Sequence, residues 1–211
     1  MVFITIHEII DIVIMAFFIG FLFQDLVKPA QRRVRTDDVL DQYGYKLKKK
    51  EPLLKRISNN NLWFSIAVLS PAIILHEMGH KFVAMAFGLT ATFHAFYANS
   101  TTLFLGILAF LAKIANFGFL FLVPGFVSIS AGATVGQEGL IAFAGPFVHL
   151  VFWIASLLIL KFKKKNISPK WRLALLLNKK INLFLFILNM LPIPGIDGWQ
   201  VYLSIFKLLG F

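Results

Sequence analysis

Long apolar runs separated by short polar segments dominate this chain, and they decide which folds are open to it. Of its 211 residues, 58% are hydrophobic and 15% are charged, and the mean hydropathy is +0.78. Soluble domains carry about a quarter charged residues, and an apolar helix of about 20 residues is long enough to cross a bilayer. We therefore predict an all-α polytopic membrane protein with about 4–6 transmembrane segments.

The apolar runs locate the expected membrane segments. The two long runs are sufficient to span on their own, whereas the N-terminal run needs its flanking residues or a tilt. Two shorter segments follow near the end of the chain. In order, the five runs are Ile12–Phe23, Leu62–Leu89, Leu140–Leu160, Asn182–Leu191 and Trp199–Leu209.

Residues 90–137 form the irregular part of the chain. The stretch “ATFHAFYANS”, which contains His94, alternates weakly and is rich in aromatic residues, so it favours a strand. Residues 103–116 form either a helix that spans the membrane or a re-entrant helix, since Lys113 interrupts the apolar run. We expect the Lys113 side chain to snorkel to a membrane interface. Strand-forming residues on both sides of Pro124-Gly125 predict a β-hairpin. We therefore expect a small membrane-embedded hairpin or sheet, covered by protein or lining a watery cavity.

The net charge of +11 is distributed like the flanks of membrane segments. Ten of the 21 basic residues lie between Lys28 and Arg56, and eight lie between Lys161 and Lys180. Because both clusters border apolar runs, we expect the lipid bilayer as a partner, no nucleic acid, and a multi-pass location in the cell membrane. The absence of cysteine excludes disulfides and thiolate metal ligands.

We expect a single membrane-embedded domain over residues 1–211. Residues 1–27 hold the first transmembrane segment, 28–61 form a basic loop, and 62–211 form the core. The opening “MVFITIHEIID” lacks a basic n-region, so no cleaved signal peptide is expected. Within it, “HEIID” at 7–11 is expected to form an interfacial turn near the membrane surface.

The motif “HEMGH” at residues 76–80 places ionisable side chains inside an apolar run. Each such group is costly at bilayer depth unless it is compensated, which marks a functional position. On a helix, His76 and His80 project from the same side, as two ligands of a zinc ion do. Glu77 stands where H-E-x-x-H hydrolases carry their general base. The alternative is a polar contact between packed helices.

A catalytic zinc needs a third protein ligand and an open position for water. The deep acidic candidate is Asp197 in “NMLPIPGIDGW”, where two prolines and two glycines break the helix. Broken helices at membrane depth commonly line a site. The alternative is a surface turn in which Asp197 caps a helix.

Three motifs in series resemble those of the site-2 protease family of intramembrane zinc metalloproteases, particularly its short archaeal-type members. The resemblance implies one zinc ion per chain, held by His76, His80 and Asp197. It also implies that Glu77 is the general base. The matching motifs, which cover most of the chain from Leu62 onwards, are HEMGH at 76–80, “AGPFVH” at 144–149, and Asn189-x-x-Pro192 followed by Asp197-Gly198.

One position departs from the family pattern. The family has asparagine at the end of G-P-x-x-N, where this chain has His149. His149 could donate a hydrogen bond to the substrate or an oxyanion, act as a fourth metal ligand, or pack between helices without a role. Asn189 is a second candidate donor.

These residues together predict an intramembrane zinc metalloprotease that cleaves within or near a transmembrane helix of a membrane-protein substrate. Glu77, Asn189 and His149 are its candidate catalytic residues. A proteolytically inactive metal-binding scaffold is the alternative, followed by a divalent-cation transporter; Glu77 beside His76 favours hydrolysis over iron chemistry. The substrate's identity and the oligomeric state stay open. The positive-inside rule makes the side of both basic clusters cytoplasmic, whereas the family resemblance implies the opposite orientation.

Overall fold

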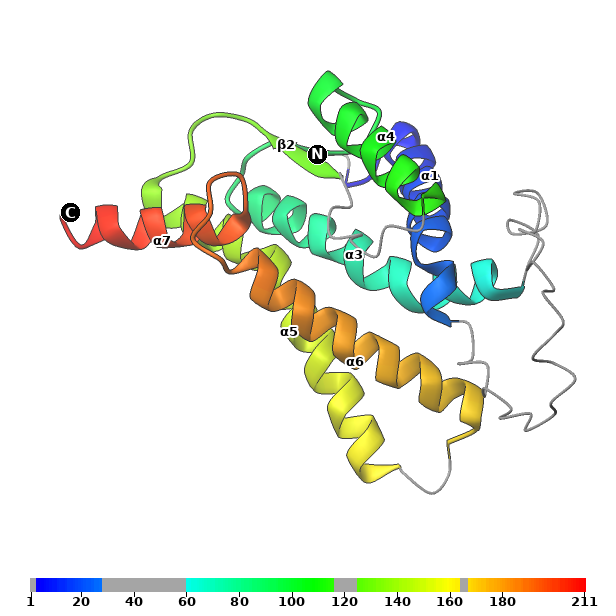
Figure 1. Cartoon of the computed structure of the whole chain (residues 1–211). Helices are drawn as coiled ribbons and strands as arrows, with labels where there is room; N and C mark the ends of the chain where they lie inside the picture. Colours follow the sequence, from blue (N-terminus) through cyan, green and yellow to red (C-terminus); the bar gives the residue numbers. More distant parts are fainter. Residues whose placement is uncertain (1–2, 28–59, 116–124, 164–166) are drawn as a thin grey trace, which may run out of the picture.

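The computed structural model of the protein describes residues 3–27, 60–115, 125–163 and 167–211. These residues are mostly helical and include one two-stranded sheet. In chain order (Figure 1), the elements are α1 Ile6–Phe23, η1 Gln24–Val27, α3 Asn60–Ala86, β1 Ala91–His94, α4 Ser100–Ile114, β2 Phe126–Ile129, α5 Val135–Phe162, α6 Pro169–Asn189 and α7 Asp197–Leu208.

Three helices in the described part of the chain are long and apolar enough to cross a membrane, namely Ile6–Leu26, Asn61–Ala86 and Val135–Phe162. The predicted helical class with membrane-length segments is thereby confirmed, while the number of about 4–6 spans stays a prediction. The segment 103–116 lies largely in α4, an apolar helix of 15 residues. At ~1.5 Å per residue, α4 is too short to cross a bilayer alone.

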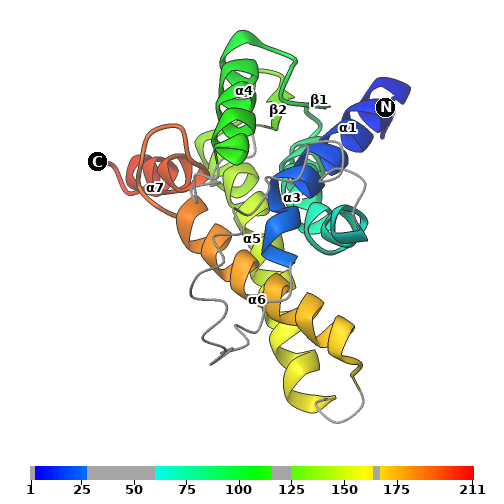
Figure 2. The ribbon, with the colours of Figure 1, turned by 45° about the vertical axis from the view of Figure 1, so that its right-hand side comes forward.

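Helix α3 is the centre of the arrangement. It packs against α1 and against α5, and α5 packs in turn along α6 and α7. Figure 2 shows α4 standing beside the two strands, with the α5–α6 pair extending away from them. The apolar core lies where α1, α3 and β1 meet, and its most buried members include Met15, Ile19, Leu22, Leu69 and Phe93.

The two strands pair antiparallel, with Phe93 opposite Val127. The strand predicted around His94 is confirmed, since β1 ends at that residue. Strand β2 follows the predicted turn at Pro124-Gly125, but the first half of that hairpin lies outside the described residues. The described partner of β2 is β1, so the sheet joins two segments that α4 separates in sequence.

The “HEIID” segment is helical, and the expected interfacial turn is wrong. Helix α1 includes it because Thr5 and Glu8 form a capping box, in which Glu8 N donates to Thr5 Oγ1 (3.3 Å) and Thr5 N donates to Glu8 Oε2 (2.8 Å). Glu8 and Asp11 are buried. Their burial is tolerated because both accept hydrogen bonds from the segment around β1, and Glu8 also pairs with Lys81.

The expectation that Lys113 snorkels to an interface is also wrong. Its side chain is buried and its Nζ lies 2.5 Å from Asp25 Oδ2 of η1. A lysine that is paired in this way avoids the cost of an isolated buried charge. The ion pair fastens the last turn of α4 to the end of the first membrane helix.

Helix α6 begins at Pro169, well before the start predicted at Asn182. Proline in the first turn suits a helix start, because its missing N–H would have no partner there. The predicted break after α6 is confirmed, since α6 ends at Asn189 and α7 begins at Asp197. Gly195 within the break has φ 88°, a left-handed conformation that glycine adopts readily.

Candidate metal centre

His76 and His80 lie one turn apart in α3, and their rings converge. The two Nε2 atoms are 3.2 Å apart, and both residues are buried. Two nitrogen lone pairs at this separation repel each other unless a proton or a metal cation lies between them. The geometry is that of the two-histidine metal site expected from “HEMGH”; their role as ligands stays a prediction.

Asp197 joins the two histidines from the start of α7. Its Oδ2 lies 3.1 Å from His76 Nε2 and 3.5 Å from His80 Nε2. The ligand atoms of the three residues all lie within 4.8 Å of one another, so they could hold a metal ion.

The close approach of α7 to the end of α6 places Asp197. A Cβ at Gly198 would lie 2.5 Å from the carbonyl carbon of Met190, so only glycine allows this contact. Ile196, and not Asp197, is the N-cap residue of α7. The alternative of a helix-capping aspartate in a surface turn is therefore wrong.

One face of α5 holds the two imidazole rings in place. A Cβ at Gly145 would lie 2.3 Å from His80 Nε2 and 2.7 Å from His76 Cε1. His80 Nδ1 donates to the backbone oxygen of Ile141 (2.7 Å), which leaves Nε2 with its lone pair free for a metal. Two imidazole nitrogens and one carboxylate form a donor set that zinc enzymes use while keeping one position open. The residues present therefore fit a catalytic zinc ion.

A cavity of about 810 Å³ borders this group. Strand β2 and the loop after it form one wall, and Trp199 of α7 lies on another. Glu77 is half-buried at the cavity, close to the segment that enters β2, since a Cβ at Gly125 would lie 3.7 Å from Glu77 Cγ. All six predicted site residues line the cavity, namely His76, Glu77, His80, His149, Asn189 and Asp197.

His149 lies beside the metal group without being part of it. Its ring centroid is 4.7 Å from that of His76, and its Nδ1 lies 2.8 Å from Asn182 Oδ1. Within the described residues, the group that could hold a metal contains His76, His80 and Asp197 alone. The geometry thus does not favour His149 as a fourth ligand.

Sequence reasoning missed the polar residues that support the site. Asn178 and Asn182 stand four residues apart in α6, a spacing that puts them on one helical face. Glu8 and Asp11 of α1 likewise stand three apart. Polar pairs at helical spacing inside apolar runs were the available signal, and only their partners, such as Lys81, required the structure.

Comparison with known proteins adds one relative. No protein-family model matches the chain, and no solved structure matches it. A curated protein of Methanocaldococcus jannaschii, named “Putative zinc metalloprotease MJ0611”, is 34% identical over 138 residues. The alignment covers 65% of this chain and 68% of the relative. With this identity and coverage, the chain belongs to the zinc metalloprotease family of that archaeal protein.

Proposed function

We propose that this protein is an intramembrane zinc metalloprotease of the site-2 type, which hydrolyses a peptide bond within or near a transmembrane helix of its substrate. The observation that carries the proposal is the convergence of His76, His80 and Asp197, with both histidines on a helix long enough to span a membrane. The archaeal relative named as a zinc metalloprotease supports the reaction class.

In this proposal His76, His80 and Asp197 hold one zinc ion, which when bound activates water and polarises the scissile carbonyl. Glu77 borders the same cavity and is the general base. It takes a proton from the attacking water and later gives that proton to the leaving amine. Asn189, at the end of α6, is a candidate donor to the carbonyl oxygen as charge develops there.

Carboxylates of α1 occupy part of the outer edge of β1. Phe93 N donates to Glu8 Oε1 (2.8 Å), and Ala95 N donates to Asp11 Oδ2 (3.3 Å). Both carboxylates come from α1. The outward N–H of Phe93 in β1 and that of Ala95 just after the strand are therefore already used.

The outer edge of β2 is the place where we expect an unwound substrate segment to pair. Phe93 directs its N–H away from β2, so Val127 opposite it directs its own backbone groups away from β1. Val127 and Ile129 also line the cavity. A peptide added to this edge by strand pairing would pass beside Glu77 and the metal group.

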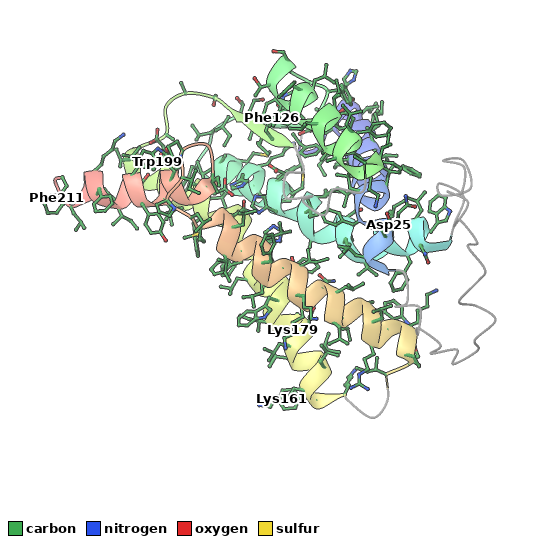
Figure 3. The ribbon with its side chains drawn as sticks, in the orientation of Figure 1. Asp25, Phe126, Lys161, Lys179, Trp199 and Phe211 are labelled. Carbon is green, nitrogen blue, oxygen red and sulfur yellow. The ribbon has the colours of Figure 1, made fainter. Side chains whose placement is uncertain are left out.

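The proposed location is the cell membrane, with a transmembrane protein as substrate and lipid around the helices. Trp199 borders the cavity, while Lys161 lies at the opposite end of the α5–α6 pair (Figure 3). The second basic cluster begins at Lys161. Lys161 therefore sits at a distance from the site, as a juxtamembrane charge would.

The test compares two carboxylates that line the same cavity. Glu77→Gln, purified at full length and reconstituted with a transmembrane substrate, should keep its zinc and its thermal stability while cleavage falls by about 10²–10⁴-fold. Glu138 also borders the cavity and accepts a hydrogen bond from Gln200 (3.0 Å). Glu138→Gln is the matched control and should cleave at close to the wild-type rate.

Three outcomes would contradict the proposal. Full cleavage by Glu77→Gln would remove Glu77 as the base. Wild-type protein that holds zinc and carries it across liposome membranes without cleaving would favour a transporter. Protein that binds zinc and does neither would favour a scaffold. Elemental analysis of His76→Ala and Asp197→Ala would show whether these residues bind the metal at all.

A further inference from the structure

A series of buried polar side chains connects α6 with the metal-binding side of α5. Asn182 is 0% exposed and His149 is 2% exposed. Asn178 stands one turn before Asn182 and reaches the backbone of Val68 in α3. Buried amides are costly unless their hydrogen bonds are made. For each hydrogen bond in this series, therefore, only one choice of donor and acceptor leaves every buried group paired.

The backbone carbonyl of Val68 fixes the first bond. A carbonyl oxygen only accepts, so the Asn178 atom 3.3 Å away from it is the amide nitrogen Nδ2. Asn178 Oδ1 then faces Asn182 and accepts from Asn182 Nδ2. The same Nδ2 donates to the backbone oxygen of Asn178 (2.9 Å). Turning the Asn182 amide round would bring its oxygen against both of these oxygens.

Asn182 Oδ1 is thereby directed at His149. It lies 2.8 Å from His149 Nδ1, and because it can only accept, Nδ1 must carry the hydrogen. A neutral imidazole has a single N–H, which leaves Nε2 as an acceptor. Among the described residues Nε2 makes no hydrogen bond, and the ring borders the cavity beside His76.

We propose that Asn178 and Asn182 are positioning residues that hold His149 as the Nδ1–H tautomer, so that its Nε2 accepts a hydrogen bond from a backbone N–H of the bound peptide. The identity of that donor rests on the proposed protease function, since backbone N–H groups are the donors that any peptide substrate carries. In this tautomer His149 cannot donate to an oxyanion. Donation to the oxyanion, the role considered for His149 because the family has an asparagine at this position, is therefore assigned to Asn189 in this proposal.

The tautomer can be observed directly by NMR of full-length protein with ¹⁵N-labelled histidine in lipid nanodiscs. Ring nitrogens with and without hydrogen differ widely in chemical shift, and the His149 signals are identified by their connection to the His149 backbone and by their loss in His149→Gln. The wild type should show hydrogen on Nδ1 and none on Nε2. Hydrogen on Nε2 would overturn the proposal.

Asn182→Leu tests the positioning role, because it removes the acceptor while keeping a side chain that branches at Cγ. It should convert His149 from one tautomer to a mixture, with zinc content at the wild-type level. Ser156→Ala, which alters another buried polar residue two turns along α5, is the matched control and should leave the tautomer unchanged. An unchanged tautomer in folded Asn182→Leu would overturn the positioning role; if that variant does not fold, the wild-type spectrum decides.

The contact with substrate is tested by kinetics. An acceptor that binds a substrate N–H in both the ground state and the transition state acts mainly on KM. Asn182→Leu and His149→Phe should therefore raise KM about tenfold, as the loss of one hydrogen bond does, and change kcat less. An unchanged KM would overturn the substrate contact. Wild-type protein that cleaves nothing would instead refute the protease function, and the NMR result would still test how His149 is held.

Discussion

Lys81 and Glu8 form a buried ion pair that joins α3 to α1 directly beside the second histidine of the metal group. Each residue is 1% exposed. Glu8 also accepts a hydrogen bond from Phe93 N. The pair therefore ties the turn of α3 that carries the two histidines to α1 and to the sheet. Each charge compensates the other, which makes their burial tolerable.

Breaking this pair from one side should destabilise the protein strongly. Glu8→Gln or Lys81→Met alone should lower the free energy of unfolding by about 3–5 kcal/mol, because the remaining charge stays buried without a partner. The double variant should recover part of that loss. Thermal unfolding followed by circular dichroism, arranged as a double-mutant cycle, measures the coupling. Lys207→Met, at an exposed position of α7, should change stability by less than about 0.5 kcal/mol. A double variant as unstable as the sum of the two single variants would contradict this account.

Gly145 should be required for metal binding, because its missing side chain makes room for the two rings. Gly145→Ala would place a Cβ 2.3 Å from His80 Nε2, so bound zinc should fall severalfold. Gly136 is the matched control on the same helix, since its Cβ would meet nothing closer than 4.0 Å. Gly136→Ala should keep its zinc and gain about 0.5–1 kcal/mol of stability. Elemental analysis and thermal unfolding measure the two effects, and full zinc content in Gly145→Ala would show that the rings can move away.

Removing the metal should destabilise the wild type. A ligand that binds only the folded state at a hundred times its Kd contributes about 2.7 kcal/mol, so a chelator should lower the midpoint of thermal unfolding. His80→Ala should lose that response because it loses a ligand. His94→Ala is the control, since His94 bonds Ser128 in the sheet and lies outside the metal group. A wild type indifferent to chelator would contradict a metal held by the folded protein.

Parts of this site could be predicted from the sequence where the interacting residues lie close together along the chain, and could not where they lie far apart. His76 and His80 were predictable because helical spacing alone puts them on one face, and the break before Asp197 was visible in its prolines and glycines. The burial of Glu8 was not predictable, because it depends on Lys81, which lies 73 positions further along the chain. No local pattern contains such a pairing.

The sheet illustrates the same limit in another form. Strand-forming residues around Phe93 and Val127 were recognised, but a hairpin was the expected pairing because neighbouring strands pair most readily. The first half of that hairpin lies outside the described residues, and the described partner of β2 is β1, beyond α4. Likewise, Lys113 was expected to reach an interface, and its burial became acceptable only through Asp25. Tertiary contacts, and not local propensity, decided each of these outcomes.

The edge of β2 that faces away from β1 gives the sharpest test of how substrate is held. Val127→Pro removes one outward N–H while leaving the bonds between β1 and β2 in place, because Val127 does not donate to β1 in this register. Proline is tolerated at such an edge position. Cleavage should fall at least about tenfold if the substrate pairs there, since one backbone hydrogen bond is lost and the proline ring blocks approach.

Val127→Ala keeps the N–H and is the matched control; it should cleave nearly as the wild type does. Comparison of kcat/KM for the two variants, at equal zinc content, measures the effect. Equal cleavage by both variants would mean that the substrate does not add to this edge of β2.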